Sequence, residues 1–154
     1  MTRIEWSDSL VLGLAPMDAT HQEFVACYNA LASADAAQFL DRLDAFIDHT
    51  EAHFAQENAW MAAMDFPGCH KAEHDRVLAV LHEVRAHVAE GDKALGRNLV
   101  TELPAWFENH ASGMDAALAF HIETIGFDTK TGEIGRPEKL SGVACSTAEG
   151  SVCG

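Results

Sequence analysis

The sequence predicts an all-α protein, an up-down-up-down antiparallel four-helix bundle with an irregular N-terminal arm and an extended C-terminal tail. Ala, Leu, Glu and Asp dominate the 154 residues and β-branched residues are few, a composition that favours helices. Four segments carry apolar residues at intervals of three and four, the spacing of one helix face. Short turn-forming stretches separate these segments, so neighbouring helices are expected to be antiparallel.

The first expected helix follows an irregular arm of residues 1–16. Pro16 stands just before the first periodic segment, as is common near a helix start. Its stripe consists of Met17, His21, Phe24, Tyr28 and Leu31. The stretch Ser33-Ala34-Asp35 breaks the stripe, and either Ser33 or Asp35 could cap the next helix.

The second and third expected helices are joined by the stop signal Asp65-Phe66-Pro67-Gly68. The second stripe consists of Phe39, Leu43, Phe46, Thr50, His53, Glu57, Trp60 and Met64. The third consists of His70, His74, Val77, Leu81, Val84 and Val88. Both stripes therefore include ligand-type side chains four residues apart, on one helix face.

The fourth expected helix follows the turn Glu90-Gly91-Asp92. Its stripe consists of Leu99, Leu103, Trp106, His110, Met114 and Ala117. Pro104 inside this stripe predicts either a kink or a helix that begins near Leu103. After about residue 125, Gly, Thr, Ser and Pro dominate and no stripe is visible. We therefore expect a bundle domain of residues 1–125 and an extended or partly disordered tail of residues 126–154.

The charge and the cysteine pattern exclude several classes of protein. The formal net charge of −14 argues against nucleic acid or an anionic membrane as a partner. No apolar run approaches the ~18 residues of a membrane span, and the first residues lack the apolar core of a signal peptide. The four cysteines are scattered singly, unlike a secreted disulfide framework. A cytoplasmic protein is expected, whether monomer or homo-oligomer, with its protein partner left open.

Ligand-type side chains on the four stripes are predicted to share one level of the bundle. Residues at one level on antiparallel neighbours flank their turn about symmetrically. The midpoint in sequence between His21 and His53 falls just past the first turn, and the midpoint between His74 and His110 falls on the third. The residues predicted at this level are His21, His53, Glu57, His70, His74, His110 and Asp115.

Five imidazoles and two carboxylates cannot form an apolar core, because each buried polar group without a partner costs ~1–3 kcal/mol. Satisfied core histidines and capping acids are the alternative, but two divalent metal ions would use all seven groups. Imidazole and carboxylate without thiolate suit iron, zinc, copper or manganese. If both carboxylates and a solvent-derived group bridge the ions, one coordination position is left for a small molecule.

The spacing of His110 and Asp115 conflicts with a regular α-helix. Residues five apart are rotated by about 140° on an ideal helix, so one of the two side chains would point away from the layer. We therefore predict a widened turn, a π-bulge over residues 111–114, which Gly113 would help to form.

The order His, His-x-x-x-Glu, His-x-x-x-His and His-x-x-x-x-Asp resembles the hemerythrin family, closest to the bacterial hemerythrins, over roughly residues 4–120. Supporting matches are Trp6 with Gly13, Met17-Asp18-Ala19-Thr20-His21, Phe54, Met61, Phe66-Pro67 and Trp106. The resemblance implies a four-helix bundle with a non-haem di-iron centre. Its expected cofactor is two Fe ions per chain with an oxo or hydroxo bridge, and its expected ligand is dioxygen (O2).

The resemblance also implies a role for each residue of the layer. His70, His74 and His110 are expected to hold the saturated iron, His21 and His53 the iron with the open position, and Glu57 and Asp115 to bridge both. The expected walls of the ligand pocket are Phe54, Trp106, Phe107 and Ala111. Three positions depart from the usual family pattern: Phe107 replaces Leu, Ala111 replaces Ile and Asn58 replaces a frequent Glu. Ala111 should open the pocket wall.

The function that the resemblance implies is reversible dioxygen binding for storage, delivery or sensing. The protein is not expected to be an enzyme, and no catalytic residue is assigned. One alternative is a di-iron enzyme that reduces peroxide or nitric oxide. Another is an iron-sequestering or signalling module that uses the tail as its partner contact.

Overall fold

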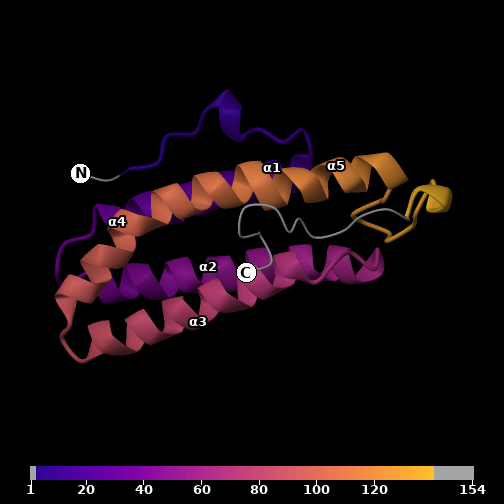
Figure 1. The fold of residues 1–154 in the computed structure, drawn as a ribbon. Coiled ribbons are helices and arrows are strands. Elements are labelled where there is room, and N and C mark those ends of the chain that lie inside the picture. Colours follow the sequence, from indigo (N-terminus) through magenta and orange to yellow (C-terminus); the bar gives the residue numbers. More distant parts are fainter. Residues whose placement is uncertain (1–2, 141–154) are drawn as a thin grey trace.

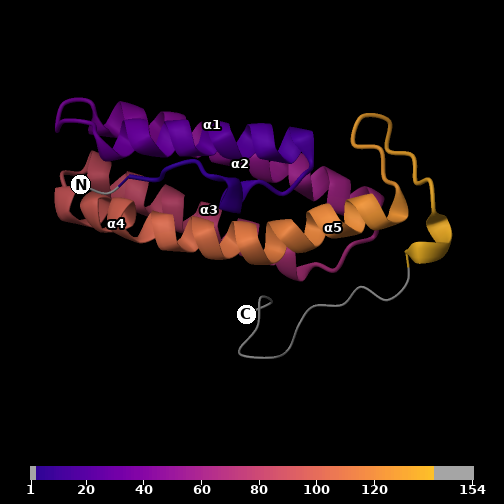
Figure 2. The same ribbon diagram turned by 90° about the horizontal axis from the view of Figure 1, so that it is seen from above.

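The computed structural model describes residues 3–140 and folds into a bundle of long helices (Figure 1). The helices are α1 (Ala15–Ala32), α2 (Phe39–Ala63), α3 (Cys69–Ala89), α4 (Lys93–His110) and α5 (Ala116–Ile125). The π-helical turn η2 (Ala111–Asp115) joins α4 to α5 without a break, so these three elements form the fourth rod of the bundle. Neighbouring rods run antiparallel (Figure 2), and the predicted four-helix bundle is confirmed. Within residues 3–140, no helix is both long and apolar enough to cross a membrane.

The turn between α1 and α2 differs from its sequence prediction. Ser33 ends α1, and its hydroxyl donates to the carbonyl of Asn29. The carboxylate of Asp35 accepts from the backbone N–H of Gln38, which is the residue just before α2. Neither Ser33 nor Asp35 is therefore the N-cap of α2, because the chain makes an additional turn over residues 36–38 before the helix begins.

The irregular N-terminal arm lies along the bundle between α1 and α4 (Figure 2). The side-chain amide of Asn29 accepts from the backbone N–H of Ile4 and donates to its carbonyl. The carboxylate of Asp18 accepts from the N–H groups of Leu12 and Gly13. These side-chain bonds replace the backbone partners that an irregular segment lacks, and they fix the arm on α1.

Pro104 lies inside α4, so the alternative in which the helix begins near Leu103 is wrong. The side chain of Asp92 caps the true start of α4 by accepting from Leu95 N–H. Proline has no N–H to give to the carbonyl four residues earlier, which is that of Val100. The hydroxyl of Tyr28, from α1, donates to this buried carbonyl instead.

The predicted π-bulge is confirmed, since residues Ala111–Asp115 form a π-helical turn. The wider turn brings Asp115 back to the face that carries His110, and Asp115 Oδ1 lies 3.1 Å from His110 Nε2. This local departure from α geometry is what allows two side chains five residues apart to share one layer.

The segment after α5 packs over the end of that helix. Gly126 ends α5 in the left-handed region, with φ 65°. A Cβ there would also lie 3.4 Å from the Cα of Gly135, whose N–H donates to the Gly126 carbonyl. Phe127, paired with Ile134 in an isolated bridge, is buried. The domain boundary after residue 125 stays a prediction, and residues 141–154 of the predicted tail lie outside the described residues.

The core consists of two apolar clusters with a polar layer between them. On α1, Met17 belongs to one cluster and Phe24 to the other, and His21 lies between them. On the fourth rod, Leu118 and Phe107 are divided in the same way. The polar layer therefore lies inside the bundle, with packed apolar side chains on both sides.

We expect Tyr28→Phe to lower the free energy of unfolding by about 1–3 kcal/mol, because the buried Val100 carbonyl would lose its donor. Urea denaturation at fixed metal content measures this change. In a Pro104→Ala background, the N–H of residue 104 becomes available to Val100. The same Tyr28→Phe change should then cost less than half as much. Equal losses in both backgrounds would refute the proposed pairing.

Candidate metal centre

The structure brings all seven predicted ligand residues into one buried layer. Helix α1 supplies one of them, α2 and α3 supply two each, and the fourth rod supplies two. None of the seven is more than 5 % exposed: His21, His53, Glu57, His70, His74, His110 and Asp115. Their donor atoms fall into two groups that share both carboxylates.

The first group has five donor atoms. The Nε2 atom of His110 lies 3.3 Å from the Nε2 atoms of both His70 and His74. Asp115 Oδ1 lies 3.0 Å from His70 Nε2 and 3.1 Å from His110 Nε2. Glu57 Oε1 lies 3.5 Å from the Nε2 atoms of His70 and His74. Donors about 2.1 Å from one ion are about 3 Å apart at right angles, so this spacing suits a single metal ion.

The second group has four donor atoms. His53 Nε2 lies 2.8 Å from Glu57 Oε2, and His21 Nε2 lies 2.9 Å from Asp115 Oδ2. His21 Nε2 is also 3.8 Å from Glu57 Oε2. Each carboxylate thus directs one oxygen toward each group, which is the arrangement that a pair of bridged ions requires.

Orphaned polar atoms test whether these residues fit metal ions. Among the described residues, Glu57 Oε1, both oxygens of Asp115 and His21 Nε2 are buried without a hydrogen-bond partner. The 2.9 Å approach of His21 Nε2 to Asp115 Oδ2 does not meet hydrogen-bond geometry, so it satisfies neither atom. Such atoms cost ~1–3 kcal/mol each unless a cation takes them up. The donor set therefore fits two divalent ions.

Burial favours the neutral form of His53, His70 and His74. At His110 burial is outweighed by the Asp115 carboxylate, which raises the pKa. Burial lowers the pKa of His53 to about 4. Burial, followed by the neighbouring His70 and His110, lowers the pKa of His74 to about 2. Imidazole coordinates a metal ion only in its neutral form, so both side chains are ready to act as ligands at neutral pH.

The two carboxylates differ in the metal-free layer. Burial, and then the neighbouring Asp115 carboxylate, raises the pKa of Glu57 well above its ordinary value. Burial also acts to raise the pKa of Asp115. The nearby imidazoles, of which His110 has the largest effect, outweigh it and hold that pKa well below the usual range. Burial thus favours the protonated form of Glu57 in the metal-free layer, and a metal ion would take the place of that proton.

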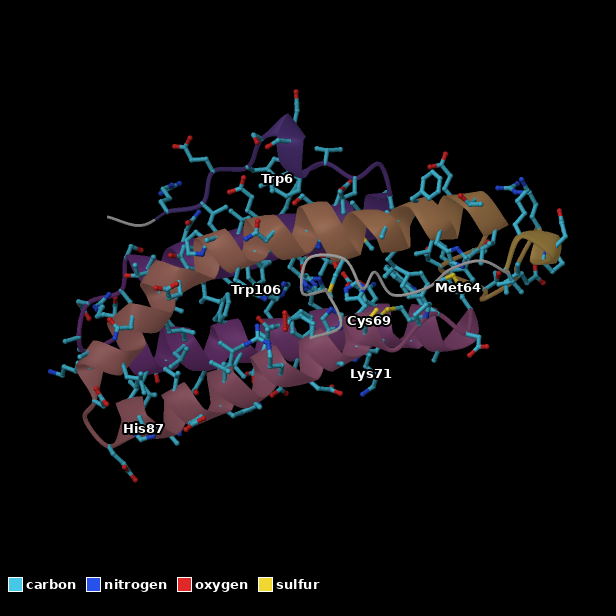
Figure 3. The ribbon with its side chains drawn as sticks, viewed as in Figure 1. Trp6, Met64, Cys69, Lys71, His87 and Trp106 are labelled. Carbon is cyan, nitrogen blue, oxygen red and sulfur yellow. The ribbon has the colours of Figure 1, made fainter. Side chains whose placement is uncertain are left out.

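Aromatic rings cover the layer on several sides. The ring of Phe54 lies parallel to His74, with centroids 3.9 Å apart. Trp106 stacks on His110 at 4.7 Å and reaches from α4 toward α2, as Figure 3 shows. The rings of Phe107 and His21 form a T-shaped pair with centroids 5.4 Å apart. All three predicted wall residues therefore contact a candidate ligand.

Ala111, the fourth predicted wall residue, is 1 % exposed and belongs to the same apolar cluster as Phe107. Phe24 was predicted only as a core residue, yet its ring stacks on Phe107 and forms a T-shaped pair with His53. The part of Phe54, Trp106, Phe107 and Ala111 in a ligand pocket stays a prediction.

Asn58 has a contact that sequence reasoning missed. Its Oδ1 atom lies 2.8 Å from Nδ1 of His74. The available signal was its position four residues after Phe54, on the face of α2 that meets α3. Without the packed helices, that position does not reveal which side chain it contacts.

Comparisons with known proteins agree with this arrangement. The family described as "Hemerythrin HHE cation binding domain" matches residues 12–119. A bacteriohemerythrin of Ralstonia nicotianae is 52% identical over 132 residues, which cover 84% of this chain and 96% of that protein.

More distant relatives carry the same name. A bacteriohemerythrin of Stenotrophomonas maltophilia is 29% identical over 129 residues, 80% of this chain and 84% of that protein. One of Methylococcus capsulatus is 24% identical over 90 residues, 57% of this chain and 69% of that protein. Because the family match spans most of the chain and includes all seven residues of the layer, the chain belongs to the hemerythrin family.

Proposed function

We propose that this protein binds dioxygen reversibly at a non-haem di-iron centre. The observation that carries the proposal is the unequal division of the donor atoms into groups of five and four that share Glu57 and Asp115. The protein offers one donor fewer to the ion beside His21 and His53. That ion is therefore the one with room for an external ligand.

In this proposal His70, His74 and His110 would hold one iron, His21 and His53 would hold the other, and Glu57 and Asp115 would serve both. When bound, the iron pair supplies the two electrons that dioxygen binding requires and recovers them on release. Each carboxylate has one oxygen beside each group of donors, so both carboxylates could serve both ions.

The surrounding side chains select the ligand. Phe54, Trp106 and Phe107 cover the layer and exclude water from it. A low-dielectric wall disfavours charged molecules that would have to lose their hydration, whereas dioxygen is small and uncharged. The candidate ligands themselves are buried, which holds each in a fixed rotamer and prepares the site before metal enters.

Ala111 favours a second candidate function. Its methyl group provides less wall than a branched side chain would, so larger or more polar molecules could approach the layer. In this alternative the same centre reduces peroxide or nitric oxide with electrons from an external reductant. The two candidates differ in turnover, because binding is stoichiometric and reversible.

The first experiment tests dioxygen binding directly. We expect the protein loaded anaerobically with two ferrous ions per chain to gain visible absorption in air and lose it when oxygen is removed, over repeated cycles. Absorption spectroscopy in a sealed cell with an oxygen electrode measures both quantities. Continuous oxygen, peroxide or nitric oxide consumption with excess reductant would reject carriage and support the enzyme.

The second experiment tests the division of ligands. We expect Asp115→Ala to lose the paired centre, because one bridging group disappears from both ions. We expect His21→Ala to loosen only the ion of the four-donor group and to keep the other. Iron analysis after gel filtration, with the optical spectrum, distinguishes these results. His82→Ala, at an exposed histidine of α3, is the control and should keep both ions.

If both ligand variants kept two metals per chain and an unaltered spectrum, the ligand assignment would be wrong. A uniform loss of metal from the control as well would indicate general instability rather than a missing ligand.

The third experiment concerns the metal-free protein. Glu57→Gln should raise its free energy of unfolding at pH 7 by about 1–3 kcal/mol, because burial raises the pKa of Glu57 and the neutral amide avoids that penalty. A carboxyl group with a raised folded-state pKa destabilises the fold above its unfolded pKa. The gain should therefore shrink as the pH falls toward 4.5, the ordinary pKa value. The same variant should lose metal.

Urea denaturation of chelator-treated protein, at several pH values, measures this gain. The matched control is Asp48→Asn, which neutralises an exposed carboxylate on the same helix. A less stable metal-free Glu57→Gln protein at pH 7 would show that the buried carboxyl does not strain the fold.

A further inference from the structure

We propose that Asn58 is a positioning residue for His74, fixing which ring nitrogen faces the metal layer. The inference rests on the proposed metal centre, but it concerns a hydrogen bond that exists without metal. Asn58 follows Glu57 on α2 and is partly buried. Its side chain lies on the outer side of the His74 ring, away from the other donor atoms.

Two side chains from one turn of α2 contact the His74 ring. Phe54 lies on the face of the imidazole, with centroids 3.9 Å apart and planes inclined by only 7°. Asn58, four residues further along, places Oδ1 2.8 Å from Nδ1. The stacked ring fixes the plane of His74 and the amide fixes its rotation within that plane. Both constraints come from the helix that also supplies Glu57.

The hydrogen bond determines where the proton of a neutral imidazole lies. When the amide oxygen accepts, the proton is on Nδ1, and Nε2 keeps its lone pair toward His110 Nε2, 3.3 Å away. With the amide reversed, its NH2 group would donate to Nδ1 and the ring proton would be on Nε2. That tautomer cannot coordinate a metal through Nε2. The orientation in the structure is thus the one that metal binding requires.

The same constraint is missing at other candidate ligands. Among the described residues, the Nδ1 atoms of His21, His53 and His70 are buried without a hydrogen-bond partner. The protein therefore presets the tautomer of His74 through a side chain, whereas these three rings have no such partner. His74 is the ligand around which the five-donor site can assemble in a fixed geometry.

The uncharged amide also affects the electron density on the ring. A carboxylate accepts a hydrogen bond more strongly than an amide oxygen does. A carboxylate at position 58 would draw the Nδ1 proton, leave more negative charge on His74 and stabilise the more oxidised metal ion. Asn58 preserves the orientation of the ring without this additional charge.

Two variants and a matched control test the proposal. Asn58→Leu keeps the approximate size and removes the acceptor, whereas Asn58→Asp keeps an acceptor and adds charge. Asn109→Leu is the control, because Asn109 is exposed and directly precedes another candidate ligand, His110. Circular dichroism establishes that each variant is folded.

The first readout is the tautomer of His74 in the metal-free protein, from long-range proton–nitrogen NMR of the imidazole. The parent protein and Asn109→Leu should show the proton on Nδ1, and Asn58→Leu should show a mixture. The second readout is titration with Co²⁺, a probe of the ligand set. Of the two Co²⁺ ions, the one that the parent protein binds more tightly should bind Asn58→Leu 10- to 100-fold more weakly. Asn58→Asp should retain the affinity of the parent.

The third readout is the midpoint potential of the iron-loaded protein, which should be lower in Asn58→Asp than in the parent. An unchanged tautomer and unchanged Co²⁺ affinity in Asn58→Leu would overturn the proposal. If Asn58→Leu did not fold, an unaltered potential in Asn58→Asp would overturn it. A parent protein that holds the Nδ1 tautomer but fails to bind dioxygen would instead reject the proposed function and leave this inference standing.

Discussion

The structure depends on the burial of seven ligand-type side chains in the middle of an apolar bundle. Each carboxylate and imidazole of the layer loses its contact with water, and several of its polar atoms have no protein partner within the described residues. Packed apolar clusters on both sides prevent the layer from opening to solvent. Two cations would compensate this burial by taking up the polar atoms that have no partner. Metal binding would therefore be linked to the stability of the fold.

The fourth rod shows how the scaffold adapts to that requirement. It must remain continuous past Pro104 to place His110, and the hydroxyl of Tyr28 satisfies the carbonyl that the proline leaves free. Directly after His110 it must widen into a π-turn to bring Asp115 to the same face. Pro104 and the π-turn thus each leave a polar group in a position that a regular helix would not give it. A contact from another rod supports each one, from Tyr28 to the Val100 carbonyl and from His70 to Asp115.

The apolar stripes and the turns predicted the bundle and the level of the layer, because helix rise and short connections fix axial positions to within about one turn. The five-residue spacing of His110 and Asp115 predicted the π-turn. The N-cap of α2, the course of the chain at Pro104 and the contact of Asn58 with His74 could not be obtained in this way. These depend on turn geometry and on partners from other helices. The division of carboxylate oxygens between the groups likewise needs the side-chain rotamers.

The central claim is that seven side chains from four rods enclose two irons. Anomalous diffraction at the iron edge, from crystals of the iron-loaded protein, tests it most directly. The account predicts two iron peaks per chain, one beside His70, His74 and His110 and the other beside His21 and His53, with Glu57 and Asp115 in contact with both. A single peak in the layer, or irons bound elsewhere, would contradict it.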